Sequence, residues 1–283
     1  MMKAVKQPLR HALLWGVIAA TTLGLTACGK KSNPDVTLIL STTTSVNDSG
    51  LLAYLAPYLK EEENITLDIL AQGSGQAIKT ASDGNCDVLI AHSPAAERDF
   101  VDGGTGDNRQ EFMYNYFVIV GPKDDPANVA GSVSASSAFT GIYENGTDFY
   151  SRDDSSGTDS KEKSLWSAAG IDTSDLPDDF YLKTGKGMLD TLIMADNTGG
   201  YTLSDKSTFL ANADKLPNLT ILYEKNDELK NVYSVILVNP DVYPDLQHEA
   251  AKRFHAWLSL KSTLEKIAAF GLDTYGESLF FVN

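Results

Sequence analysis

The chain has 283 residues, a net charge of −15 and 42% hydrophobic residues, enough to build sizeable cores in one or two domains. This acidic balance excludes nucleic acid as an expected partner, because a nucleic-acid surface needs clustered Lys and Arg. It also means that the overall electric field would not attract an anion, so an anionic ligand would have to be held by local donors.

The first 28 residues predict an export signal. Lys3, Lys6 and Arg10 are followed by an apolar run over residues 13–25, which is too short to span a bilayer comfortably. The run ends in Leu-Thr-Ala-Cys, which resembles the lipobox of bacterial lipoproteins, a family cut before a lipid-bearing cysteine. We expect a signal peptide over 1–28, lipidation of Cys28 and a polar tether over 29–35. The alternative is an ordinary signal peptide cut near Ala27.

Either reading predicts an exported protein, and the lipidated form would be anchored to a membrane at the cell surface or in the periplasm. The first 27 residues carry three positive charges and no acids, so the mature chain would have a charge near −18. The second cysteine, Cys86, then has no partner. It lies in an apolar stretch, and we expect a small buried hydrophobic residue.

The first strand predicted after the tether ends in a run of hydroxyl residues. Residues 36–40 are β-branched or Leu-rich, Ser41 to Ser45 all carry hydroxyls, and a helical pattern begins at Leu51. The first backbone N–H groups of a helix lack intrahelical partners and sit at the positive end of its dipole. With hydroxyl donors added, the stretch predicts an anion site. The alternative is a strand that ends in ordinary hydroxyl turns.

A second strand over 65–70 leads through Gly73 and Ser74 into another helix, and a third, almost continuously apolar strand covers 86–92. The amides of Gly73 and Ser74 could lie beside the first loop, although an ordinary tight turn would also explain them. This β-α-β-α-β alternation predicts a doubly wound α/β domain with its ligand at the carboxyl ends of the strands.

The middle of the chain contains a second hydroxyl-rich loop. A polar loop over 102–109 precedes a strand over 112–122 that leaves the first domain, and a helix is expected over 132–140. Residues 148–159 then read DFYSRDDSSGTD before a helix over 161–170, with Thr158 or Asp159 as its N-cap. Arg152 is the one basic residue of this loop. Its alternative role is a surface ion pair with Asp153 or Asp154.

The remaining elements suggest a return to the first domain. We expect a helix over 188–195, a strand and helix over 200–210, strands over 219–223 and 232–238, and a helical region over 242–271. Two crossings between two α/β lobes follow, with lobe I formed by 36–115 and 232–283 and lobe II by 116–231. The ligand would lie in the cleft between them, which could close by hinge motion.

At this point the sequence resembles the tungstate-binding components of bacterial ABC transporters. The resemblance rests on Thr-Thr-Thr-Ser at 42–45, Asp-Ser-Gly-Leu-Leu at 48–52, Gly-Ser-Gly-Gln-Ala at 73–77, Ser151-Arg152 with Ser-Gly-Thr at 156–158, and Tyr-Thr-Leu at 201–203. It covers most of the mature chain and implies a two-lobed periplasmic-binding-protein fold of type II.

The resemblance implies that the two hydroxyl loops line an oxyanion site from opposite lobes, with Arg152 as the charge donor. The chain departs from the family pattern where Asp153 replaces a glycine, Ser155 an aspartate and Asp159 a histidine. The candidate oxyanion-binding residues are Thr42, Thr43, Thr44, Ser45, Gly73, Ser74, Arg152, Ser156, Gly157, Thr158, Tyr201 and Thr202. Tyr201 and Thr202 would fit core and turn positions equally well.

The residue types favour a binding protein that captures a tetrahedral oxyanion. Tungstate, molybdate and sulfate carry no proton at neutral pH, so their cage needs only donors, whereas phosphate benefits from a carboxylate acceptor such as Asp153 or Asp154. We expect tungstate or molybdate as ligand and no cofactor. We expect no metal site, since His92, His248 and His255 lack metal-ligand spacing and fit structural or surface positions. We expect no catalysis, since the sequence contains no Gly-x-Ser-x-Gly elbow, Cys–His arrangement or P-loop. The expected form is a monomer that delivers its ligand to an ABC permease. The alternatives are a phosphate- or sulfate-binding protein of the same fold and a structural or adhesive lipoprotein.

Overall fold

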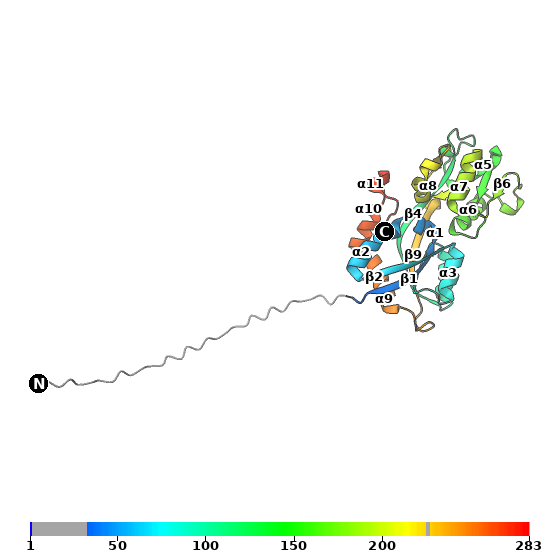
Figure 1. Ribbon diagram of the computed structural model, residues 1–283. Coiled ribbons are helices and arrows are strands. Elements are labelled where there is room, and N and C mark those ends of the chain that lie inside the picture. Colours follow the sequence, from blue (N-terminus) through cyan, green and yellow to red (C-terminus); the bar gives the residue numbers. More distant parts are fainter. Residues whose placement is uncertain (2–32, 225–226, 283) are drawn as a thin grey trace. The chain divides into compact units, whose positions relative to one another are not determined.

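The computed structural model describes Met1 and residues 33–224 and 227–282 (Figure 1). The predicted signal peptide, the predicted lipidation site Cys28 and residues 29–32 of the tether lie outside the described residues. Within the described part of the chain, no helix is both long and apolar enough to cross a membrane. Asn33–Asn283 form one compact unit.

The first half of the fold is the predicted parallel β-α-β arrangement. Strand β1 pairs in parallel with β2 on one side and β3 on the other, so all three carboxyl ends point the same way. Their connections are helical. The elements are β1 (Val36–Thr43), α1 (Thr44–Asp48), α2 (Leu51–Glu63), β2 (Ile65–Gln72), α3 (Ser74–Ser82), β3 (Val88–Ala91) and α4 (Pro94–Asp102).

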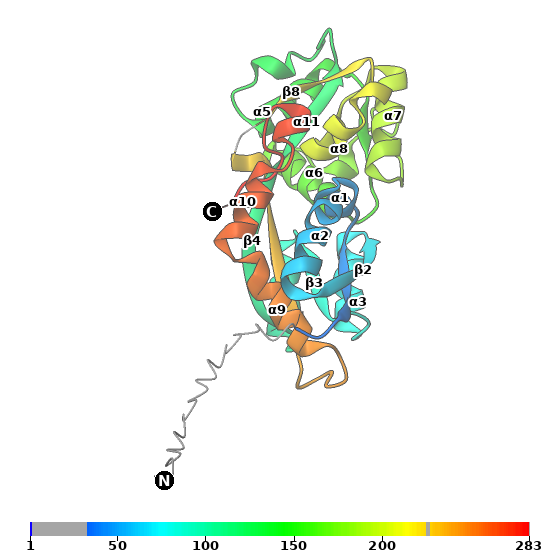
Figure 2. The same ribbon diagram turned by 60° about the vertical axis from the view of Figure 1, so that its left-hand side comes forward.

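Two long strands connect this half to the rest of the fold. Strand β4 (Gly106–Pro122) pairs with β9 (Lys230–Val238) along its first part and with β7 (Thr202–Asp205) and β8 (Leu219–Tyr223) along its second part. Figure 2 shows β4 running the length of the body, from the level of α9 (His248–Leu258) towards β8. The sheet order is β2-β1-β3-β9-β4-β7. The prediction of a polar loop over 102–109 was therefore wrong for its last residues, because β4 begins at Gly106 and both Gly106 and Asp107 pair with β9.

The second half contains more antiparallel pairing than a doubly wound domain would have. Strands β7 and β8 both run antiparallel to β4, while β5 and β6 form a separate parallel pair. The remaining elements are α5 (Ala135–Asn145), β5 (Phe149–Ser151), α6 (Gly157–Ala168), β6 (Tyr181–Lys183), α7 (Met188–Thr198) and α8 (Lys206–Ala211), with short 3-10 turns η1 (Val129–Gly131), η2 (Thr173–Asp175), η3 (Ala213–Lys215) and η4 (Asp227–Leu229).

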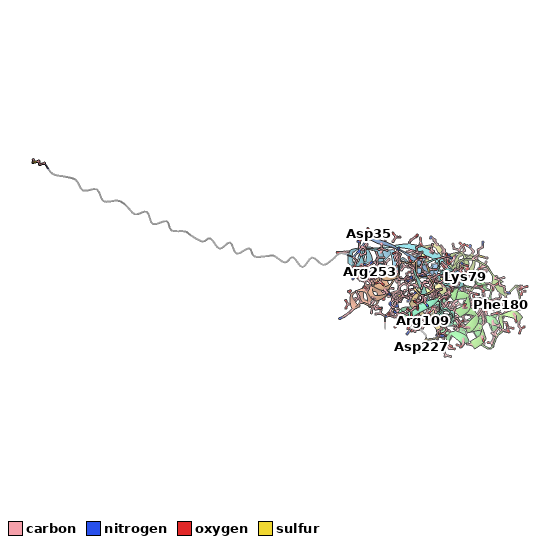
Figure 3. The ribbon with its side chains drawn as sticks, turned by 90° about the horizontal axis from the view of Figure 1, so that it is seen from below. Asp35, Lys79, Arg109, Phe180, Asp227 and Arg253 are labelled. Carbon is pink, nitrogen blue, oxygen red and sulfur yellow. The ribbon has the colours of Figure 1, made fainter. Side chains whose placement is uncertain are left out.

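The apolar side chains form separate cores in the two halves. One pair of clusters is built on β1–β3, β9 and the C-terminal helices, and includes Trp257. The other pair is built on the second part of β4, β5–β8 and α5–α7, with Trp166 packed edge-on against Phe139 and Phe149. Asp35 and Phe180 lie at opposite ends of the described body (Figure 3). Cys86 is free and buried, as predicted.

The predicted helical region over 242–271 is interrupted. It forms α9, α10 (Lys261–Ala269) and a last turn, α11 (Leu272–Tyr275). Leu260 has extended backbone angles and lies before α10, so α9 and α10 are separate helices. Gly271 was expected to end the region, but with its φ of 98° it precedes α11, while Phe270 caps α10. The sequence pattern did not reveal this bend because both helices keep an apolar face towards the same core.

Candidate anion-binding site

The carboxyl ends of β1 and β2, the residue after β3 and the loop before α6 meet around one small cavity. The cavity is too narrow to admit a water-sized sphere, and the total space between its atoms, including the part open to solvent, is about 160 Å³. The lining residues are Thr43, Thr44, Ser45, Gln72, Gly73, Ser74, His92, Arg152, Ser156, Gly157 and Thr158. Nine of the twelve candidates from the sequence are among them, so the two hydroxyl loops lie together around one cavity.

The first hydroxyl loop supplies side-chain donors. Thr43 ends β1, α1 begins at Thr44, and the hydroxyls of Thr43 and Ser45 lie 3.1 Å apart. The sequence did not predict α1, which includes the last two hydroxyl residues, Thr44 and Ser45, and precedes the expected helix α2. Both hydroxyls are nearly inaccessible to solvent. They therefore offer donors where an anion would be largely dehydrated.

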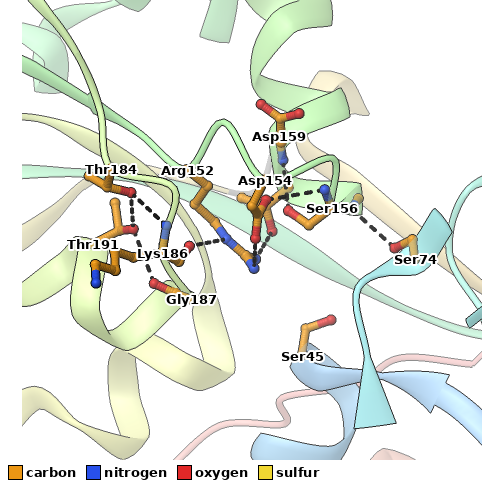
Figure 4. A network of polar contacts seen from close by, with 12 residues as sticks. Ser45, Ser74, Arg152, Asp154, Ser156, Asp159, Thr184, Lys186, Gly187 and Thr191 are labelled. Carbon is orange, nitrogen blue, oxygen red and sulfur yellow. Dashed lines mark hydrogen bonds and ion pairs between the residues drawn. The ribbon is translucent and has the colours of Figure 1, made fainter. Parts of the chain in front are cut away.

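Arg152 carries the positive charge of the cavity. Its side chain is buried, and it donates from Nη1 to Thr158 Oγ1 (3.3 Å), from Nη2 to Asp154 Oδ2 (2.5 Å) and from Nε to Lys186 O (3.4 Å) (Figure 4). A guanidinium has five N–H donors, so two remain for a ligand. The ion pair with Asp154 considered for Arg152 is present, but the guanidinium is not on the surface.

The second loop also presents the N-terminus of α6. Its N-cap is Ser156, whose side chain accepts from Asp159 N (3.2 Å), so the prediction of Thr158 or Asp159 as the cap was wrong by two or three residues. The backbone N–H of Gly157 donates to Ser74 Oγ at 3.0 Å. This hydrogen bond joins the start of α3 to the start of α6 across the cavity (Figure 4).

His92 is a cavity residue that the sequence analysis treated as structural or surface. It is buried, and its ring nitrogens lie 3.3 Å from Ser45 Oγ, 3.5 Å from Ser74 Oγ and 2.8 Å from Asn231 Oδ1. Burial lowers the pKa of His92 to about 4, so the imidazole is neutral at pH 7. Its place one residue after β3, at the edge where the strands end, is the signal that could have identified it.

Three candidates are placed elsewhere in the described structure. Thr42 points away from the cavity and its Oγ1 is buried with no hydrogen-bond partner among the described residues. Tyr201 packs in the second core and donates from its hydroxyl to Asp125 (2.9 Å), while Thr202 donates to the carbonyl of Tyr150 (2.7 Å). These contacts favour structural roles.

The position of Thr42 leads to a prediction about stability. Replacing Thr42 by valine removes an unpaired buried hydroxyl while keeping nearly the same shape, and such a group costs about 1–3 kcal/mol. We expect Thr42→Val to raise the free energy of unfolding by about 1 kcal/mol and to leave ligand affinity unchanged. Urea unfolding and calorimetric titration measure the two quantities. A loss of affinity without a change in folding would instead place the Thr42 hydroxyl against the ligand.

No carboxylate lines the cavity among the residues that the structure describes. The nearest to Arg152 is Asp154, whose Oδ2 accepts from the guanidinium and whose Oδ1 accepts from Ser156 N (3.1 Å). Both carboxylate oxygens of Asp154 therefore already accept hydrogen bonds within the loop. No group of His, Cys, Asp or Glu that could hold a metal ion occurs in the described part of the chain.

A buried acid stands behind the second loop. Glu162 accepts a hydrogen bond from Tyr181 OH (2.6 Å), and the same hydroxyl lies 2.9 Å from Ser151 Oγ, next to Arg152. Burial raises the pKa of Glu162 to about 8 and that of Tyr181 well above its usual range. At neutral pH the carboxyl of Glu162 is thus largely protonated and adds little negative charge near the cavity.

The fold and the cavity correspond to a known class of binding proteins. The family model described as "PBP superfamily domain" matches residues 29–261, and the chain belongs to this superfamily. Within it, the chain is a member of the TupA family. It is 39% identical to the tungstate-binding protein TupA of Peptoclostridium acidaminophilum, over 92% of this chain and 94% of that protein.

Solved structures of similar proteins show the same fold. The tungstate-binding protein TupA from Desulfovibrio alaskensis G20 is 40% identical with a TM-score of 0.75, covering 87% of this chain and 98% of that one. The structure titled as the tungstate ABC transporter from Geobacter sulfurreducens is 37% identical with a TM-score of 0.77, covering 84% of this chain and all of that one. The two-lobed periplasmic-binding-protein fold predicted from the sequence is confirmed.

Proposed function

We propose that this protein captures tungstate or molybdate outside the cytoplasm and delivers it to an ABC permease. The main support is the cavity lining, which combines one guanidinium with hydroxyls and backbone amides and includes no carboxylate among the described residues. Such a cage suits an oxyanion that has no proton to donate. Charge-assisted hydrogen bonds contribute roughly 1.5–3 kcal/mol each, so six or seven could support an affinity of about −12 kcal/mol after the costs of association.

The remaining parts of the proposal concern location and architecture. Cys28 carries the lipid anchor, the protein acts as a monomer, and lobe I (36–115 and 232–283) and lobe II (116–231) close around the ligand. Separate apolar cores on the two sides support these boundaries. So does the course of β4 and β9, because these two strands form the connections between the lobes. Mass spectrometry of the membrane-extracted protein would test whether Cys28 carries lipid.

Calorimetric titration with tungstate, molybdate, sulfate and phosphate tests the ligand class. We expect one-to-one binding of tungstate and molybdate at nanomolar to micromolar concentrations, with phosphate at least 100-fold weaker, because the described lining offers no carboxylate to accept the proton of phosphate. Tight phosphate binding that disappears in Asp154→Asn would mean that Asp154 turns towards the ligand and that the protein is a phosphate-binding protein. Absence of binding to all four anions would contradict the proposal and favour a structural lipoprotein.

The second loop contains two residues with left-handed backbone angles, Asp153 (φ 41°) and Ser155 (φ 59°). Glycine adopts this region without the steric cost paid by other residues. Asp153 makes one exposed ion pair, to Lys163, whose contribution is small. We expect Asp153→Gly to change stability by less than about 1 kcal/mol and to keep or slightly raise affinity, since it removes a negative charge beside Arg152. A large loss of binding by calorimetry would show that Asp153 has a direct role.

A further inference from the structure

His92 contacts Ser45 of the first hydroxyl loop, Ser74 at the start of α3 and Gly157 at the start of α6. The hydrogen-bond partners of its ring determine which ring nitrogen carries the hydrogen. Asn231 uses its amide nitrogen to donate to Asn115 Oδ1 (2.8 Å) and Tyr233 OH (3.0 Å). The amide oxygen of Asn231 therefore faces His92 Nδ1 at 2.8 Å as an acceptor. Nδ1 of the neutral ring must donate to it, which leaves Nε2 as a lone-pair acceptor.

The acceptor nitrogen Nε2 faces Ser74, whose hydrogen bond with Gly157 joins the start of α3 to the start of α6. Ser74 Oγ lies 3.5 Å from Nε2 and also accepts the N–H of Gly157 at 3.0 Å. A hydroxyl has one hydrogen, so when Ser74 gives it to His92 its lone pairs turn towards Gly157. Ser45, 3.3 Å from the same nitrogen, has the Thr43 hydroxyl at 3.1 Å as another partner.

Gly157 also packs directly on the imidazole. A Cβ atom at this position would lie 2.4 Å from Cε1 of His92, a distance that side chains do not reach. The ring cannot easily give way, because it is buried and held by Asn231. Ser74, His92 and Gly157 line both the anion cavity and a wider groove that continues past Pro94, Phe117 and Lys161. These three residues thus form the wall between the cavity and the groove.

We propose that His92 is a positioning residue that keeps the anion cavity closed: it orients Ser74 so that Ser74 holds the N-terminus of α6. This inference rests on the proposed function and adds the device that retains the ligand. His92 acts through Ser74 and need not touch the anion. Its connection through Asn231 to Asn115 links the wall to β9 and β4, the strands that connect the two halves.

A double-mutant cycle tests this role. Release of radiolabelled tungstate is followed during a chase with unlabelled tungstate, in the purified wild-type protein, Ser74→Ala, His92→Leu and the double variant. A hydrogen bond contributes about 0.5–1.5 kcal/mol, so we expect release about fivefold faster in each single variant. The double variant should release no faster than the faster single one, because both changes break the same contact. Ser49→Ala is the matched control, since this buried serine donates to Val46 O outside the cavity.

Two outcomes would overturn the proposal. Effects that multiply to about 25-fold in the double variant would mean that His92 and Ser74 act independently. The second measurement needs no ligand: two-bond ¹H–¹⁵N correlations of the histidine rings, with the His92 signal identified by its loss in His92→Leu. We expect a neutral ring protonated at Nδ1, and protonation at Nε2 would refute the proposed orientation of Ser74. Failure of tungstate to bind at all would count against the proposed function, while the ring spectrum would still decide the role of His92.

Discussion

Replacing Arg152 by alanine is expected to weaken oxyanion binding by at least tenfold. Arg152 is the one positively charged side chain that lines the cavity within the described structure. Its two unused N–H groups would each form a charge-assisted hydrogen bond of about 1.5–3 kcal/mol, and one such bond alone corresponds to roughly 10- to 150-fold in affinity. The dissociation constant for tungstate, measured by calorimetry in low salt, reports the effect.

Controls separate this effect from damage to the loop. Arg152→Ala leaves Asp154 unpaired, so the variant Arg152→Ala with Asp154→Ala removes both partners of the ion pair and should still bind weakly. Lys163→Ala removes a cation on α6, outside the cavity, that is paired with Asp153 and Asp159. This variant should change the dissociation constant less than twofold. An unchanged dissociation constant in Arg152→Ala would remove Arg152 from the site.

The second large effect concerns stability and pH. The pKa of Glu162 is about 8 in the folded protein against an ordinary value of 4.5. Between these values the unfolded chain has an ionised Glu162 and the folded protein a protonated one. The free energy of unfolding therefore falls as pH rises, by about 1.4 kcal/mol per pH unit from this group alone. We expect Glu162→Gln, which cannot ionise at this position, to remove this contribution to the pH dependence of the free energy of unfolding.

Urea unfolding of both proteins at several values between pH 5 and pH 9 measures this difference. The stability of Glu162→Gln relative to wild type should increase steadily up to about pH 8 and then level off, because above that pH both states of the wild-type protein are ionised. Glu61→Gln, at an exposed site on α2, is the control, and its free energy of unfolding should vary with pH in parallel with that of the wild-type protein. Parallel curves for Glu162→Gln would show that the buried carboxyl is already ionised at neutral pH.

The sequence predicted the parallel strands of the first half and the two hydroxyl loops because local patterns encode them. Apolar strands that end abruptly in hydroxyls or glycine, each followed by a helix, identify the edge where β1, β2 and their loops meet. Nine of the candidate residues accordingly line one cavity. The strand over 219–223 was predicted with the bounds that β8 has.

Long-range contacts explain what the sequence did not predict. The place of His92 directly after β3 can be read from the sequence, but its hydrogen bond to Asn231 cannot, because Asn231 is 139 residues away in the chain. Thr42 belongs to the same hydroxyl run as Thr43 but faces the opposite side of β1, because successive side chains of a strand alternate. The start of β4 was missed because its polar residues are fixed by pairing with β9 and not by an apolar pattern.

The most direct test of the account is a crystal structure of the protein with tungstate, phased at a tungsten absorption edge. We predict a single strong anomalous peak in the cavity, within hydrogen-bond distance of the Arg152 guanidinium and the hydroxyls of Ser45 and Thr158. A peak elsewhere, or a tungstate held only at the surface while this cavity contains none, would contradict the assignment of the site.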